Sequence, residues 1–179
     1  MLIRRMYADD KFISGASVDE VRAHFQAWAP QNLEARLRPD TACTISDVSH
    51  LSVDTTPRYN YCLFVDEICL ESASHPEALG PVVKLVCRDW VSPWSPEERL
   101  QGVHPLFHDG ITEYDEEDVG WMYMPILVYM DKYENFHDWG WSDVYVRPPF
   151  IDGSEDETNM VGHWRGKKVV GQEKGVSGT

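Results

Sequence analysis

The chain has 179 residues, 42% of them hydrophobic and 12% aromatic, a composition typical of a packed fold rather than of a disordered chain. Its formal net charge of −14 argues against nucleic acids and membrane surfaces as partners, because phosphate groups and anionic lipids would repel it. The same charge favours a basic protein or a metal cation as partner.

The distribution of charges and thiols indicates a cytoplasmic protein. Arg4 and Arg5 could begin a signal peptide, but charged residues at 9–11 stand where its apolar stretch should be. The longest uncharged stretch, 119–130, is shorter than the roughly 20 apolar residues of a membrane span. No cysteine pair has CxxC spacing, so we expect buried free thiols rather than a zinc or redox motif. The four cysteines are Cys43, Cys62, Cys69 and Cys87.

The first predicted element is a helix over 18–29. Ser17 and Glu20 have the spacing of a capping box, and apolar residues then recur at helical intervals. Pro30 disfavours continuation of this helix, and a further helical turn is expected over 33–37.

The middle of the chain is predicted to form strands. Weak strand character over 42–48 is followed by the aromatic and β-branched run 58–65. The residues 68–72 would return antiparallel to that run across a turn at Asp66 and Glu67, and 81–90 forms another strand.

The second half contains a long loop over 91–118, interrupted by a short helix that Ser95 and Pro96 begin. A short strand over 120–124 and a helix over 125–136 follow, with a continuous strand through Met130 as the alternative to the helix.

The last predicted elements are a strand over 142–147 and a polar, flexible C-terminal tail over 153–179. The order of elements predicts an α+β fold, because strands and helices do not alternate regularly. An N-terminal helix would pack on a mainly antiparallel sheet, within a single domain over 1–152. An exposed sheet edge would also allow a homodimer.

The first candidate site is a cluster of two imidazoles and a carboxylate, His104, His108 and Asp109. One histidine could act as a general base that Asp109 orients. Two histidines and a carboxylate also suit Zn²⁺ or Fe²⁺, but Pro105 between the histidines excludes the usual helical pair. We therefore expect no metal and no cofactor.

A second candidate site is the acidic run over 113–118, in which Glu116, Glu117 and Asp118 would dock a basic partner. The run lacks the spacing of a calcium-binding loop, and so does a second acidic patch over 152–157.

The third candidate site is an aromatic block over 121–145. Most of these rings would fill the core, whereas Trp139 and Trp141 flank a predicted turn at which indoles are hard to bury. Together with Tyr123, they are the predicted aromatic binding residues.

Two functions compete on this basis. The first is an acidic protein-binding module, resembling an inhibitor or regulator in role, which engages a basic partner through acidic loops and exposed tryptophans. The alternative is a small isomerase, lyase or hydrolase that uses the His104, His108 and Asp109 cluster in an aromatic cavity. The chain contains none of the common nucleotide-binding, α/β-hydrolase or zinc-protease motifs.

Overall fold

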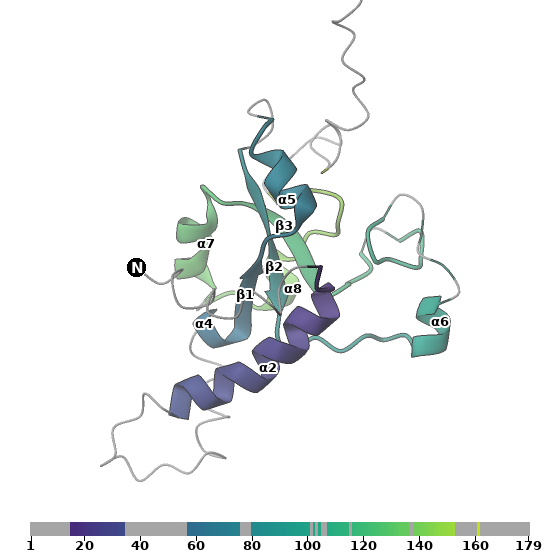
Figure 1. Cartoon of the computed structure of the whole chain (residues 1–179), viewed down its shortest axis with the longest axis horizontal. Helices are drawn as coiled ribbons and strands as arrows, with labels where there is room; N and C mark the ends of the chain where they lie inside the picture. Colours follow the sequence, from purple (N-terminus) through teal and green to yellow (C-terminus); the bar gives the residue numbers. More distant parts are fainter. Residues whose placement is uncertain are drawn as a thin grey trace, which may run out of the picture.

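The computed structural model describes residues 15–34, 57–75, 80–100, 102, 104, 107–114, 116–136, 138–152 and 161. Its elements are α2 (Val18–Glu34), α4 (Pro57–Asn60), β1 (Tyr61–Phe64), α5 (Glu67–Ser72), β2 (Val82–Cys87), α6 (Pro96–Leu100), β3 (Trp121–Pro125), α7 (Tyr129–Asn135) and α8 (Trp141–Val144). Figure 1 shows the strands at the centre, α7 on the left and α6 on the right.

The three strands form an antiparallel sheet in the order β1-β2-β3. In the central strand, Lys84 pairs with Phe64 on one side and with Tyr123 on the other. The outer edge of β3 meets Ile151 in a single parallel bridge. Because both faces of β2 are covered, the strand is almost continuously buried, which explains why all its residues except Lys84 are apolar.

The sheet separates two clusters of buried side chains. Residues that point to one face of the strands, such as Val86 and Trp121, pack with α2 and α5. The alternate residues, such as Leu85 and Met122, pack against Phe136, which follows α7, and against Val144 of α8. This alternation follows from the two-residue period of a strand. The predicted α+β fold, with an N-terminal helix on an antiparallel sheet, is therefore confirmed.

Helix α2 begins where the sequence predicts. The backbone N–H and Oγ of Ser17 donate to the Glu20 carboxylate, and the Glu20 N–H donates back to Ser17 Oγ. The helix nevertheless continues through Pro30 to Glu34, beyond the predicted end. Ala29 is buried and Leu33 packs on the core, so tertiary contacts outweigh the hydrogen bond that a proline removes.

The predicted hairpin after β1 is wrong. Residues 67–72 form helix α5, because the Asp66 side chain caps it by accepting a hydrogen bond of 2.9 Å from Cys69 N–H. Strand β1 pairs instead with β2, and its predicted first residues lie in the short helix α4.

The predicted strand over 142–147 is also wrong, since α8 occupies its first residues. The Gly140 N–H donates to the Asp143 carboxylate and so caps that turn. The other nearby predictions are confirmed: α6, β3 and α7 lie close to their expected ranges, and the continuous-strand alternative through Met130 is excluded. The predicted strand over 42–48 lies outside the described residues. Of the predicted tail, only Val161 is described, and it is buried in the core.

Candidate functional site

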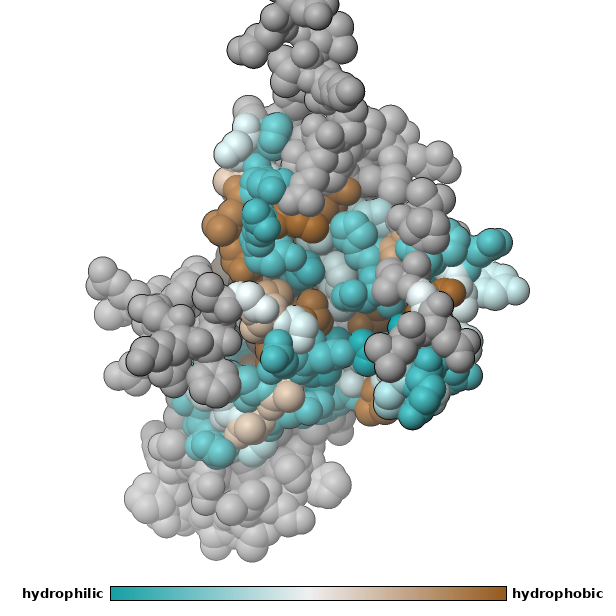
Figure 2. Space-filling model, turned by 45° about the vertical axis from the view of Figure 1, so that its right-hand side comes forward, coloured by the Kyte–Doolittle hydropathy of each residue, from teal (hydrophilic) through white to brown (hydrophobic). Residues whose placement is uncertain are grey.

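A cavity of about 230 Å³ opens where three segments meet. They are the start of α2, the loop that leads from β2 into α6, and the loop that enters β3, all on the right-hand side of Figure 1. Its lining residues are Ser17, Val18, Asp19, Trp90, Ser92, Trp94, Arg99, Asp109, Ile111, Glu117, Asp118, Val119 and Trp121. Figure 2 brings this side forward and shows a mainly hydrophilic surface interrupted by small hydrophobic areas.

Glu117 holds the loop before β3 in place. Its carboxylate accepts hydrogen bonds from the N–H groups of Ile111 and Thr112, from the Thr112 hydroxyl and from Trp94 Nε1. It also pairs with Arg147 at 2.5 Å, and both side chains are buried. Burial alone would raise the pKa of Glu117, but these hydrogen bonds and the Arg147 charge outweigh it, so the pKa is lowered. Glu117 is therefore a buried anion directed into the protein.

Asp109 places a carboxylate at the cavity wall. It has a positive φ of 58°, a backbone conformation that Asp and Asn tolerate better than most residues. Its Oδ2 accepts a hydrogen bond of 2.9 Å from Trp121 Nε1, while the residue remains exposed. No described residue donates to Oδ1, which leaves that oxygen available to a ligand.

Asp118 connects the cavity with α8. Its carboxylate accepts a 2.7 Å hydrogen bond from Gly120 N–H and a 2.8 Å hydrogen bond from Trp141 Nε1. Burial raises the pKa of Asp118, although these hydrogen bonds and the Arg22 charge oppose the shift.

Buried Arg22 lies behind the cavity lining and contacts the backbone and ring that border it. It donates to the carbonyls of Cys87 and Gly120 and lies over the Trp90 ring, 4.6 Å from its centroid. Gly120 has a φ of +74°, and a Cβ there would lie 2.3 Å from Trp90. A residue without a side chain is thus needed at this position for Trp90 to pack.

The cavity lining carries an excess of negative charge. Its carboxylates come from Asp19, Asp109, Glu117 and Asp118, whereas Arg99 is the one Lys or Arg among the described lining residues. Arg99 is already paired with Asp19 at 2.7 Å. Burial would raise the pKa of Asp19, but Arg99 and Arg22 lower it overall, so this carboxyl group is charged at neutral pH.

The structure brings together only some of the predicted site residues. Asp109, Glu117 and Asp118, predicted in two separate sites, line one cavity, whereas neither His104 nor His108 is among its lining residues. Both histidines are half-buried, and His108 Nδ1 lies 3.2 Å from the hydroxyl of Tyr123.

The other predicted binding residues lie elsewhere. Tyr123 is fully buried in β3, and Glu116 is exposed beside the cavity loop. Trp141 is half-buried and stacks on Tyr61, with ring centroids 5.8 Å apart, whereas 45% of the Trp139 surface is exposed.

Sequence reasoning missed Trp90, Trp94 and Asp19 as cavity residues. The two tryptophans stand four positions apart in a loop rich in Pro and Ser, which is a weak local signal. Nothing local in the sequence indicates that this loop approaches the start of α2.

Comparisons with protein families, with curated proteins and with solved structures found no match. Within the described ranges, no group of three or more His, Cys, Asp or Glu side chains is arranged to hold a metal ion. None of the helices described combines the length and hydrophobicity needed to cross a bilayer.

Proposed function

We propose that this protein is an acidic binding module that receives a cationic side chain of a basic partner protein in the cavity. The observation that carries the proposal is the Asp109 carboxylate, which Trp121 orients at the wall of a negatively charged, tryptophan-lined cavity. A guanidinium or ammonium group entering there would donate to Asp109 Oδ1.

The size of the cavity supports a side chain as the ligand. A volume of about 230 Å³ is below the roughly 300–1,000 Å³ typical of sites for drug-sized ligands. The net charge of −14 would add long-range attraction and so accelerate association with a basic protein.

A cytoplasmic location, expected from the sequence, forms part of the proposal. It is supported by the three described cysteines, Cys62, Cys69 and Cys87, which are all free thiols.

Oligoarginine is a suitable probe, because Trp90, Trp94 and Trp121 line the cavity and their fluorescence reports its occupancy. We expect oligoarginine to bind and an oligocitrulline of equal length, which lacks the charge, not to bind. Asp109→Asn should weaken binding by about fivefold, since it removes one partly exposed ionic contact and Asn tolerates the positive φ.

Glu116→Gln is the matched control, because Glu116 is an exposed carboxylate in the nearby acidic run over 113–118 and does not itself line the cavity. Equal weakening by both substitutions would show that only the overall charge matters and would refute the cavity as the binding site. Absence of oligoarginine binding at low salt would refute the proposal altogether.

The enzymatic alternative receives less support. It needs a histidine base in the cavity, and the lining contains Asp109 but neither His104 nor His108. The hydrogen bond that Asp109 accepts comes from Trp121. We therefore do not extend the proposal to catalysis.

A further inference from the structure

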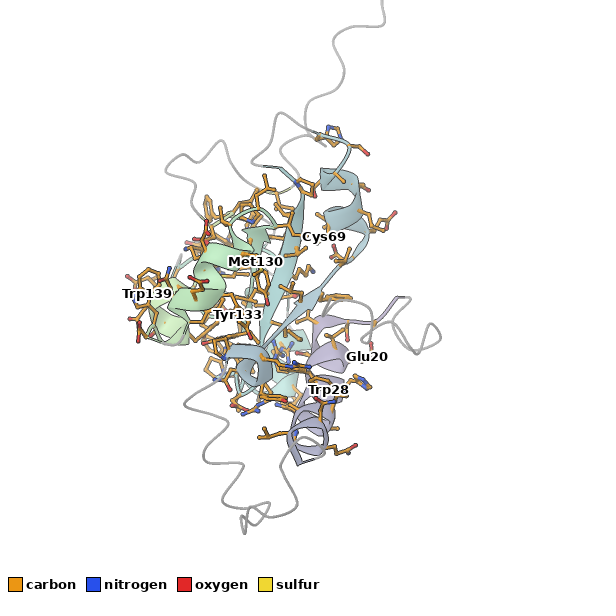
Figure 3. All side chains as sticks on the ribbon, turned by 90° about the vertical axis from the view of Figure 1, so that its left-hand side faces the viewer. Glu20, Trp28, Cys69, Met130, Tyr133 and Trp139 are labelled. Atoms are coloured by element: carbon orange, nitrogen blue, oxygen red, sulfur yellow. The ribbon has the colours of Figure 1, made fainter. Side chains whose placement is uncertain are left out.

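A second surface of unusual composition lies on the side of the sheet opposite α2 and α5. It consists of four exposed apolar side chains in and around α7, with exposed fractions between 40% and 75%. They are Ile126, Leu127, Met130 and Trp139. We refer to them as the α7 surface. Figure 3 shows Met130 and Trp139 on one side of the strands and Cys69 and Trp28 on the other.

The residues of the α7 surface lie at the two ends of one short helix: Ile126 and Leu127 precede α7, Met130 lies in its first turn and Trp139 follows it. Leu127 lies in the turn before α7, in which Val128 N–H donates to the carbonyl of Pro125, and Met130 lies in the first turn of the helix. Beyond α7, the backbone N–H of Trp139 donates to the carbonyl of Asn135 at 3.0 Å, which folds the chain back at the helix end. From Met130 to Asn135 the helix rises only about 7 Å, and the hydrogen bond to Asn135 keeps Trp139 at the end of the helix, so one short segment can reach from Met130 to Trp139.

Exposed acidic residues accompany this apolar surface along the chain. Exposed carboxylates stand beside it on α7, after it and on α8: Asp131, Glu134, Asp138 and Asp143. Lys132 is the one Lys or Arg between positions 126 and 145, and it is held by Asp152 at 2.8 Å. We refer to these four carboxylates as the rim of the α7 surface; the one Lys or Arg of this chain segment is already engaged.

From this combination we infer that the α7 surface docks a basic amphipathic helical segment of a partner protein. The apolar face of such a segment would cover Leu127, Met130 and Trp139, and its Lys or Arg residues would meet the carboxylates of the rim. Charge complementarity selects this occupant over a second copy of the chain, because two copies would bring the same acidic rims together. The inference is independent of the cavity, whose lining segments lie on the side of the strands opposite α7 in Figure 1.

The experiment uses the full chain and a synthetic amphipathic peptide of Leu and Lys with helical spacing. A peptide of the same composition in scrambled order, which has no apolar face, is its control. We expect the amphipathic peptide to bind more tightly and to weaken at about 0.5 M NaCl, at which the charges of the rim are screened. The double substitution Leu127→Ser and Met130→Ser should reduce its affinity by at least about tenfold, since it removes two large apolar contacts.

Leu70→Ser is the matched protein control. Leu70 on α5 is 66% exposed and Met130 is 65% exposed, but Leu70 lies on the other side of the sheet. Leu70→Ser should leave the affinity for the peptide unchanged. Asp109→Asn should also leave it unchanged, so the test of the α7 surface can fail or succeed independently of the cavity proposal.

Three outcomes would overturn the inference. The first is that the amphipathic peptide does not bind at low salt. The second is that the double variant and Leu70→Ser lose equal affinity for the peptide. The third is that the free protein forms a dimer that only the double substitution dissociates. Sedimentation velocity on the wild type and both variants measures the last of these. Circular dichroism confirms that the double variant, altered only at exposed positions, remains folded.

Discussion

At the scale of single residues, Glu117 matters most for the shape of the cavity. Its buried carboxylate joins Trp94, the backbone of residues 111–112 and Arg147, so one side chain connects three separate parts of the chain. We expect Glu117→Gln to destabilise the protein by about 2–4 kcal/mol at pH 7, because the Arg147 charge would remain buried with a neutral partner. Urea unfolding measures this difference.

The pH dependence of that loss has a definite sign. The pKa of Glu117 is lowered in the folded protein, so its contribution is complete above the unfolded value of about 4.5 and disappears as the pH falls through the folded value. The stability difference between wild type and Glu117→Gln should therefore shrink in acid. Glu116→Gln, at an exposed position, should have almost the same free energy of unfolding as the wild type at neutral and at acid pH. A stability difference between wild type and Glu117→Gln that grows in acid would contradict this account.

At the scale of elements, the two capping boxes provide a comparison within one chain. Ser17 and Glu20 cap α2, and Ser95 and Glu98 cap α6 through the same contacts. Helix α2 packs on the core, whereas none of the described side chains of α6 is buried. We expect Ser17→Ala to lower the free energy of unfolding by about 1 kcal/mol.

Ser95→Ala should leave global stability nearly unchanged, because α6 can fray without exposing the core. Thermal and urea unfolding of the two variants test the contrast. Equal losses would mean that α6 unfolds together with the rest of the protein. A loss confined to Ser95→Ala would contradict the assignment of α2 to the core.

The elements also show which parts of the fold are visible in the sequence. The capping box of α2 involves residues three positions apart, so it could be predicted. The misassigned segment 68–72 has the composition of a strand, but the Asp66 cap and the packing of Cys69 against the core make it helical. Pro30 was misleading for a similar reason, since tertiary packing outweighed a local preference.

The candidate site was less predictable than the fold. Asp109, Glu117 and Asp118 could be selected as acidic residues in a loop, but their joint approach to Trp90 and the start of α2 depends on contacts distant in sequence. Arg22 spans 98 positions to reach Gly120, and no local pattern encodes such a contact. The inward orientation of Glu117 likewise depends on Arg147, 30 positions away.

At the scale of the whole molecule, a net charge of −14 implies substantial self-repulsion in the folded state. Screening should relieve it, so we expect NaCl at about 0.5 M to raise the melting temperature by about 2–4 °C, equivalent to about 1 kcal/mol. The buried Glu117–Arg147 pair is screened less than surface charges and should not reverse the effect. Scanning calorimetry at low and high NaCl tests this, and a lower melting temperature in salt would contradict it.

The hydrogen bond from Trp141 to Asp118 has a thermodynamic consequence, because it joins the wall of the cavity to the first residue of α8. A cation that draws Asp118 toward itself must weaken this bond and alter the free energy of α8, which follows the α7 surface in the chain. Linkage requires the effect to be reciprocal: whatever factor a cavity ligand imposes on affinity at the α7 surface, a segment docked there imposes on the cavity.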